Sequence, residues 1–183
     1  MVFTLFFAYR TQFCCRNQQR FIATNHSRGM FKSGPFVAEQ LDAVRPSQVQ
    51  PNGVDLTLDA VFVQTAPGRI ERGDKAVGDR KEIAPTDGFY TLSPGGYIVR
   101  YGERIHIPEN HIGFLYPRSS LLRNSCMLDT AVWDAGYEGR GEGLLEVYHE
   151  LSVEQDARIA QLVLAEADHE GQYDGSYQGE YLK

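Results

Sequence analysis

Most apolar residues of this chain fall in short runs that are separated by turn-forming residues. Over residues 54–59 apolar and polar residues alternate strictly, directly after a Pro-Asn-Gly turn. Because a period of two is typical of a strand with one buried face, the segment 49–63 is predicted to be half-buried, with Asp55 and Thr57 on its polar side. Further short strands are predicted at residues 89–92, 97–101, 104–107, 112–116, 144–148 and 159–165.

Short strands at intervals of about 8–12 residues, with turn signals between them, are typical of an all-β sandwich, barrel or jelly roll. The apolar residues of segment 36–41 have the spacing of one helical face, which predicts one short helix there. Residues 65–88 contain many turn-forming and charged residues and predict a hairpin that extends over the surface. The predicted fold class is therefore all-β, with one or two short helices.

Three parts of the chain differ in composition. Residues 1–29 carry four arginines and no acidic residue, and their apolar start is too brief and too interrupted for a signal peptide. We interpret them as an extension that is disordered or that arises from a mis-assigned start; an extra edge strand at residues 3–9 is the alternative. Residues 30–168 form the predicted β domain. Residues 169–183 combine glycines with tyrosines and show no apolar period, a composition that suits a flexible lid.

Charge and composition exclude several classes of function. The net charge is −6, and since residues 1–29 carry +4, the rest of the chain carries −10 and would repel nucleic acid. No apolar run reaches the roughly 18 residues that a membrane helix needs. Neither the three cysteines nor the five histidines have the spacing of a disulfide framework or a zinc site. We therefore expect a cytoplasmic protein that binds neither nucleic acid nor membrane.

Two polar segments stand between the apolar runs of residues 113–149. Arg118, Ser119 and Ser120 offer a bidentate cation and two hydroxyl donors within three residues, a combination that suits a polyphosphate. Asp134 and Tyr137 follow in a turn that contains glycine. Each segment by itself is also typical of an ordinary surface turn.

The order and spacing of four segments carry more information than any one of them. NGVDLTLDA, PRSSL, WDAGYEG and RIAQL follow one another between residues 52 and 162. Together they resemble the dUTPase and dCTP deaminase superfamily over about residues 49–179, and most of all its archaeal dUTPase (deoxyuridine triphosphate nucleotidohydrolase) subgroup. The resemblance implies a dUTPase-like β-barrel or jelly roll that assembles as a homotrimer. It also implies a hydrolase that converts dUTP to dUMP and pyrophosphate with the help of Mg²⁺.

The resemblance assigns roles to individual residues. Asp55 matches the aspartate that helps to hold the magnesium–triphosphate through water, and Asp134 matches the carboxylate that orients and activates the attacking water. Tyr137 matches the aromatic residue that stacks under the deoxyribose and excludes a ribose 2′-hydroxyl. The hairpin from Thr130 to Asp134 would read the pyrimidine edge with backbone groups. The residues implied to bind the phosphates, or to close over the nucleotide from the tail, are Arg118, Ser119, Ser120, Gln161, Tyr173, Tyr177 and Gln178.

A second reaction stays open at this point. The superfamily's deaminases need no zinc and use an arginine after the phosphate motif and a glutamate on a later strand, which Arg123 and Glu146 match. A carboxyl group in the apolar run 144–147 would have a raised pKa if it faced the core, which suits a proton shuttle at a cytosine ring. Altered spacing around Glu146 favours the hydrolase, because a one-residue slip turns a strand's side chains to the other face. The alternative is therefore a dCTP deaminase, or a bifunctional enzyme that converts dCTP to dUMP.

Overall fold

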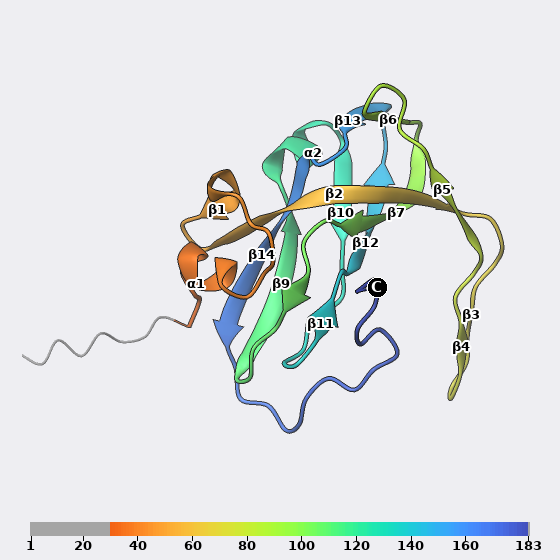
Figure 1. The fold of residues 1–183 in the computed structure, drawn as a ribbon. Helices are drawn as coiled ribbons and strands as arrows, with labels where there is room; N and C mark the ends of the chain where they lie inside the picture. Colours follow the sequence, from red (N-terminus) through yellow and green to blue (C-terminus); the bar gives the residue numbers. More distant parts are fainter. Residues whose placement is uncertain (1–29, 183) are drawn as a thin grey trace, which may run out of the picture.

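The computed structural model describes residues 30–182 and shows a small β-barrel with two short α-helices (Figure 1). Helix α1 spans Gly34–Ala38, a 3₁₀ helix spans Pro46–Gln48, and α2 spans Ser119–Arg123. The strands are β1 (Val49–Gln50), β2 (Gly53–Gln64), β3 (Arg69–Ile70), β4 (Lys75–Ala76), β5 (Arg80–Ile83), β6 (Phe89–Leu92), β7 (Gly95–Tyr101), β8 (Ile105–His106), β9 (His111–Pro117), β10 (Cys126–Asp129), β11 (Glu138–Gly139), β12 (Glu142–Val147), β13 (Leu151–Glu154) and β14 (Arg158–Glu166).

The main sheet is antiparallel, with its strands in the order β10-β12-β7-β2-β14-β9. The two end strands of this order, β9 and β10, also contact each other, so the sheet curls into a nearly closed barrel. The fold class predicted from strand spacing is confirmed. Fully buried aliphatic side chains from β2, β7, β12 and β14 fill the interior, among them Leu56, Leu58, Val99, Leu145, Leu162 and Leu164.

Strand β2 crosses the middle of the sheet and is buried on both faces through most of its length. Asp55 and Thr57 are only 1% and 4% exposed, so the prediction of a half-buried strand is wrong for this segment. Its polar side is covered by Gln48 and Glu103, whose side chains form hydrogen bonds with β2. Alternating polar residues therefore mark an internal polar network here instead of a solvated face.

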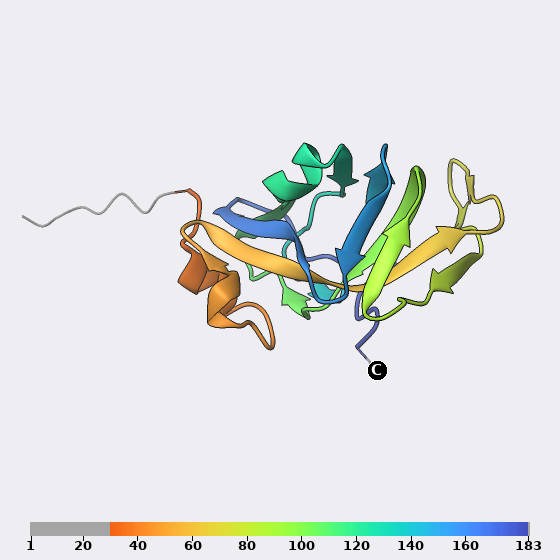
Figure 2. The same ribbon diagram turned by 90° about the horizontal axis from the view of Figure 1, so that it is seen from above.

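The hairpin predicted over residues 65–88 is confirmed. Strands β3 and β4 pair at the end of an arm that projects from the barrel beyond β5 (Figures 1 and 2). The sequence pattern did not predict β10, β13 or α2. Each has four or five residues, and β10 and β13 are stabilised by their partners β12 and β6, which lie elsewhere in the sequence.

The first described residues pair with the C-terminal end of β14. The amide of Glu166 donates to the carbonyl of Met30 at 2.8 Å, and the amide of Lys32 donates to Leu164 at 2.9 Å. The predictions made for residues 1–29 lie outside the described residues. Within residues 30–182, no helix combines the length and the apolar character that a membrane crossing would require.

Candidate active site

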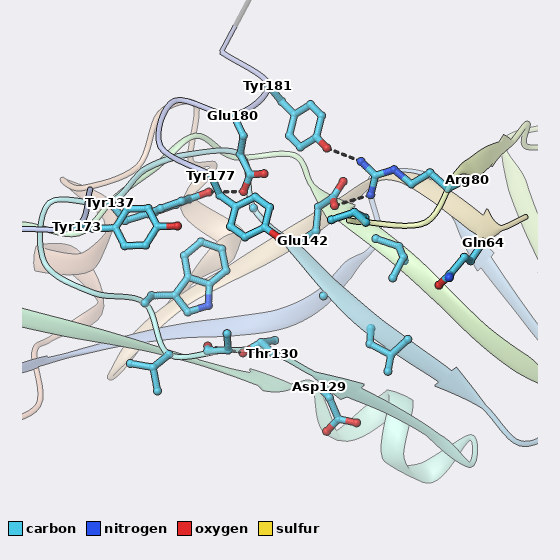
Figure 3. Close-up of a pocket in the computed structure, with 18 of the residues that line it drawn as sticks. Gln64, Arg80, Asp129, Thr130, Tyr137, Glu142, Tyr173, Tyr177, Glu180 and Tyr181 are labelled. Carbon is cyan, nitrogen blue, oxygen red and sulfur yellow. Dashed lines mark hydrogen bonds and ion pairs between the residues drawn. The ribbon is translucent and has the colours of Figure 1, made fainter. Parts of the chain in front are cut away.

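A cavity of about 1000 Å³ opens between β12, the loop after β10 and the C-terminal tail (Figure 3). Its lining includes Thr130, Asp134 and Tyr137 from the loop, and Tyr173 and Tyr177 from the tail. Five residues that the sequence associates with substrate therefore meet at one cavity. Its volume is in the range of small-molecule binding sites.

Tyr137 forms a rigid part of the cavity wall and is 6% exposed. Its ring lies edge-on to Trp133, with centroids 5.0 Å apart, and to Tyr173, at 5.7 Å. Its hydroxyl donates to Glu180 Oε1 at 2.9 Å. Burial raises the pKa of Tyr137 and the nearby Glu180 carboxylate raises it further, so the ring stays neutral at physiological pH.

Charged side chains line the opposite wall. Arg80 forms an ion pair with Glu142, with Nη1 2.6 Å from Oε2, and also donates to the hydroxyl of Tyr181 (Figure 3). Among residues 30–182 the second oxygen of Glu142 is buried without a hydrogen-bond partner. Asp134 differs from Glu142, because its carboxylate is exposed and has neither an ion pair nor a hydrogen bond to any described residue. A carboxylate in that state is free to bind and orient a water molecule.

The tail closes on the cavity of its own chain. The amide of Tyr173 donates to Ala135 at 2.7 Å, and the amide of Gly179 donates to Glu138 at 2.8 Å. The side chain of Gln178 bridges the same turn, donating to the carbonyl of Gly136 at 2.9 Å and accepting from the amide of Glu138 at 3.2 Å. Residues 173–179 therefore form a seam along the turn that carries Tyr137.

We expect this seam to tighten as the pH falls. Burial raises the pKa of Glu180 above its ordinary value of 4.5; the hydrogen bond from Tyr137 opposes the rise, and Glu142 adds to it. Since the docked tail holds the Glu180 proton more firmly than a released tail does, docking gains stability below pH 4.5 and loses it as the pH rises through the raised pKa.

Hydrogen exchange of the Gly179 amide in mildly acidic and neutral buffer measures this dependence. The protection factor should be greater at the lower pH. Glu180→Gln is the matched variant, because an amide keeps an oxygen for Tyr137 and cannot titrate, so its protection should change less with pH. Equal pH dependence in both proteins would contradict the expectation.

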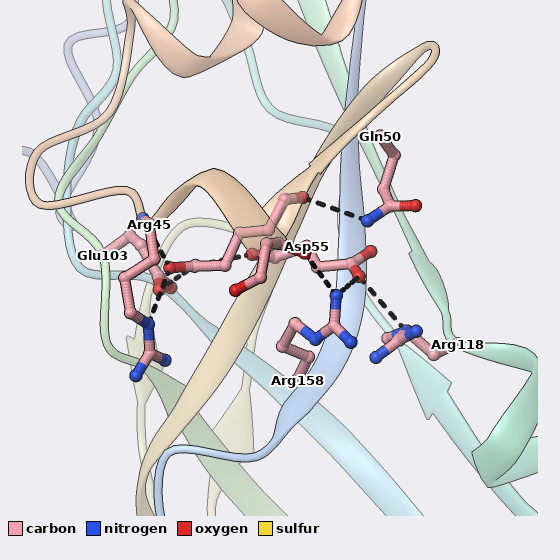
Figure 4. Close-up of polar contacts among 8 residues, drawn as sticks. Arg45, Gln50, Asp55, Glu103, Arg118 and Arg158 are labelled. Atoms are coloured by element: carbon pink, nitrogen blue, oxygen red, sulfur yellow. Dashed lines mark hydrogen bonds and ion pairs between the residues drawn. The ribbon is translucent and has the colours of Figure 1, made fainter.

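A second polar cluster surrounds Asp55 (Figure 4), and Asp55 is not among the residues that line the cavity. Asp55 Oδ2 lies 3.3 Å from Arg118 Nε and 3.2 Å from Arg158 Nη1. Gln161 is the cross-strand neighbour of Asp55 on β14. Burial raises the pKa of Asp55, although both arginines lower it, so this carboxylate is placed at some cost in free energy. Such a residue is a candidate for function.

Arg118 reaches this position because of where β9 ends. It follows the last residue of β9, its amide donates to the carbonyl of Ile159 on β14 at 2.9 Å, and α2 begins at the next residue. Ser119 and Ser120 occupy the first turn of α2 and are exposed. The guanidinium is thus fixed against Asp55 while the two hydroxyl groups face solvent.

A buried carboxylate fixes the backbone around Asp55. Glu103 is 5% exposed and accepts three hydrogen bonds: from the Thr57 amide at 2.9 Å, the Thr57 hydroxyl at 2.8 Å and Gln48 Nε2 at 2.7 Å. Gln48 Nε2 also donates to the carbonyl of Asp55 at 2.8 Å. The pairing of β2 with β14 shifts register between Arg158 and Ala160, so Glu103 supplies an acceptor beside an irregular part of the ladder.

Glu103→Gln should lower the free energy of unfolding by about 1–3 kcal/mol, the cost of a buried polar group left without a partner. All three contacts of Glu103 are donors, and a glutamine amide would turn its own N–H groups toward one of them. Denaturant-induced unfolding measures the loss. Glu154→Gln is the control, because Glu154 is exposed on β13. An unchanged midpoint in Glu103→Gln would show that the network contributes little.

The sequence of this chain matches a known protein family. The family model described as dCTP deaminase-like matches residues 25–167. The chain belongs to the dCTP deaminase-like family. A curated relative, the probable deoxyuridine 5′-triphosphate nucleotidohydrolase of Halobacterium salinarum (strain ATCC 29341 / DSM 671 / R1), is 59% identical over 157 residues, which cover 82% of this chain and 95% of the relative. The deoxyuridine 5′-triphosphate nucleotidohydrolase of Methanocaldococcus jannaschii is 40% identical over 143 residues, covering 75% of this chain and 92% of that one.

A solved structure supports the same fold for this dCTP deaminase-like protein. The 2′-deoxycytidine 5′-triphosphate deaminase of Agrobacterium tumefaciens aligns with a TM-score of 0.58 and 18% identity, over 75% of this chain and 48% of that one. The chain therefore spans about half the length of that deaminase. At this identity the likeness concerns the fold alone.

The structure divides the predicted site residues of this dCTP deaminase-like protein into two groups. Thr130, Asp134, Tyr137, Tyr173 and Tyr177 line the cavity. The residues that do not line it are Asp55, Arg118, Ser119, Ser120, Arg123, Glu146, Gln161 and Gln178. Within one chain, Asp55, Arg118, Ser119, Ser120 and Gln161, which are expected to bind the phosphates or their metal, thus do not share a cavity with Thr130 and Tyr137, which are expected to bind the base and sugar.

The two residues implicated in deamination are also placed by the structure. Glu146 shares the outer side of β12 with Glu142 and Leu144, while Leu145 and Val147 are buried. Glu142 and Leu144 line the cavity, whereas Glu146, two residues beyond Leu144 on the same face, does not line it and accepts a hydrogen bond from Tyr148 at 2.9 Å. Arg123 is exposed at the end of α2.

Sequence reasoning missed several residues of the dCTP deaminase-like site. Arg158 stands in the same RIAQL segment that supplied Gln161, so its basic side chain was a usable signal. Glu103 and Glu142 gave no comparable signal, because each looks like an ordinary strand-end carboxylate until the tertiary structure places it beside a buried network or a cavity.

Proposed function

We propose that this protein hydrolyses dUTP to dUMP and pyrophosphate. The observation that carries the proposal is the meeting of Thr130, Asp134 and Tyr137 at one cavity, in a chain that belongs to the dCTP deaminase-like family. The names of the curated relatives support dUTP as the substrate. The altered spacing around Glu146 supports hydrolysis over deamination, because a one-residue slip in a strand turns its side chains to the other face.

The chemistry needs one activated water molecule. Asp134 orients a water whose oxygen attacks the α-phosphorus of dUTP; the bond from that phosphorus to the oxygen bridging the β-phosphate breaks, and pyrophosphate leaves. The proton of the water passes to the carboxylate. Tyr137 packs against the deoxyribose, where its buried ring leaves no space for a 2′-hydroxyl. Thr130 and its neighbours in the loop hold the pyrimidine.

The residues around Asp55 fit a hydrated Mg²⁺. Both arginines contact Oδ2 of Asp55, and Oδ1 has no hydrogen-bond partner among residues 30–182, so it can accept from a metal-bound water. Within the same residues, no group of three or more His, Cys, Asp or Glu side chains could hold a metal directly. Mg²⁺ commonly keeps several waters and binds through substrate phosphates, as this donor set requires. When bound, it would neutralise charge on the triphosphate.

A homotrimer would join the two groups of residues into one site. The proposal is that Arg118, Ser119 and Ser120 of one subunit, together with Gln161, hold the phosphates of a nucleotide whose base and sugar occupy the cavity of its neighbour. Exposed apolar side chains flank the segment 118–120 in the chain, as a subunit interface would require: Tyr116 is 61% exposed and Leu122 59%, and Tyr148, whose amide bonds to Ser125 after α2, is 60% exposed.

Mixed subunits test the shared site. Arg118→Ala and Asp134→Asn should each be inactive alone, and trimers that contain both should regain part of the activity, because some sites then combine an intact Arg118 with an intact Asp134. Mixing after mild dissociation and measuring pyrophosphate release gives the answer. Mixed trimers without regained activity would show that the site lies within one subunit.

One assay tests the reaction itself. Purified protein is incubated with Mg²⁺ and either dUTP or dCTP, and the nucleotides and pyrophosphate are separated. Pyrophosphate from dUTP with dCTP unchanged supports the proposal. A uracil nucleotide formed from dCTP would establish deamination instead.

A further inference from the structure

Four aromatic rings form a continuous row from the barrel core to the tail. Tyr101 and Trp133 have centroids 6.2 Å apart, Trp133 and Tyr137 5.0 Å, and Tyr137 and Tyr173 5.7 Å, with interplanar angles of 52°, 86° and 70°. We call these four residues the aromatic row. Tyr101 is fully buried, so the row starts from a fixed point in the core and ends at the cavity.

Trp133 is held from both its backbone and its ring. Its amide and carbonyl bond to the carbonyl and amide of Gly113 at 3.2 and 2.8 Å. Its indole lies on the backbone of Gly141, where a Cβ atom would come within 1.9 Å of Cη2 and 2.6 Å of Cζ3. Only glycine leaves space for this ring, and the side chain is 7% exposed. The indole therefore has little freedom to move.

Tyr137 has two kinds of neighbour. Tyr173 and Glu180 belong to the tail and reach Tyr137 only when the tail is docked. Trp133 and Gly139 belong to the barrel, and a Cβ atom at Gly139 would come within 2.7 Å of the Tyr137 hydroxyl. Of the aromatic contacts of Tyr137, the one with Trp133 is thus independent of the tail.

We propose that Trp133 is a positioning residue that fixes the Tyr137 ring, and through that ring determines how strongly the enzyme prefers a deoxyribose over a ribose nucleotide. The proposal rests on the dUTP diphosphatase function put forward above. A ring that can tilt would make room for the 2′-hydroxyl, whereas a ring held edge-on by the indole would not. Gly141 belongs to the same arrangement, because it provides the space that the indole fills.

Substitution of Trp133 tests the proposal through a ratio of substrates. Trp133→Phe and Trp133→Leu should reduce the ratio of kcat/KM for dUTP to kcat/KM for UTP by up to about tenfold, the range that an edge-to-face aromatic contact can supply. The kcat for dUTP should fall much less, since Asp134 is untouched. General damage to the fold would instead lower kcat/KM for both substrates by the same factor and leave their ratio unchanged.

Gly141→Ala tests the same proposal independently. The added methyl group should displace the indole and reduce the same ratio. In a Trp133→Leu background the methyl group meets vacated space, so Gly141→Ala should then cost no further stability or discrimination. Gly96→Ala is the matched control, because Gly96 lies on the neighbouring strand and its Cβ would meet only Leu144 at 3.7 Å.

The outcomes separate the two proposals. A wild-type protein that leaves dUTP intact with Mg²⁺ would refute the proposed function. A wild-type protein that prefers dUTP, with folded Trp133 variants that keep the full dUTP-to-UTP ratio, would refute the role of Trp133 alone. If Gly141→Ala fails to fold, the Trp133→Phe ratio decides.

Discussion

Asp134→Asn should abolish turnover of dUTP, with a loss in kcat of at least about 100-fold, while nucleotide binding stays nearly intact. An amide has the size of the carboxylate but cannot take a proton from water, and general base catalysis is commonly worth about 10²–10⁴-fold. The Asp134 side chain has no hydrogen bond or ion pair to other described residues, so the substitution should disturb little else.

Two measurements separate binding from chemistry in this variant. Pyrophosphate release gives the rate. Binding can be followed by the fluorescence of Trp133, which is the only tryptophan in the chain and lines the cavity. Asp87→Asn is the control, since Asp87 is exposed in the turn before β6. Normal turnover in Asp134→Asn would remove this residue from the mechanism.

Asp55→Asn should lower kcat/KM for dUTP by about 100-fold, and the loss should depend on the Mg²⁺ concentration. The variant removes the negative charge that lies between Arg118 and Arg158, so the two guanidinium groups lose the partner that orients them and face each other with like charge. It also removes the charge expected to attract hydrated Mg²⁺.

A titration of activity with Mg²⁺ tests this result, because the variant should need more metal for half of its maximal rate. Asp59→Asn is the matched control: Asp59 lies on the same strand and pairs with Arg100 at 2.7 Å, but belongs to neither group of site residues. If Asp55→Asn needs no more Mg²⁺ than the wild type, Asp55 acts only in holding the arginines.

Much of the barrel could be predicted because its strands obey local rules. The segments around Tyr97–Tyr101 and Ile159–Ala165 are apolar runs between turn residues, and the structure places strands there. The short strand β10 could not be predicted from its four residues alone, because its backbone hydrogen bonds depend on pairing with β12, which lies later in the chain. The burial of Asp55 and Thr57 could not be predicted either, because alternation in sequence does not reveal what covers the polar side of a strand.

The candidate site, like the barrel, was predictable in part from local sequence and in part only from tertiary contacts. Motif order alone indicated Asp134, Tyr137 and Thr130, and the structure brings these three to one cavity. The sequence by itself determined the family motifs and the all-β class, because both depend on residues close together along the chain. Only the tertiary structure decided that Glu146 lies beyond the cavity, that Glu103 holds the backbone around Asp55, and that an indole over Gly141 contacts the Tyr137 ring. Strand register and side-chain packing fix these relations, whether the residues are distant, as Glu103 and Thr57 are, or near, as Trp133 and Tyr137 are, and local patterns of apolar and polar residues do not reveal them.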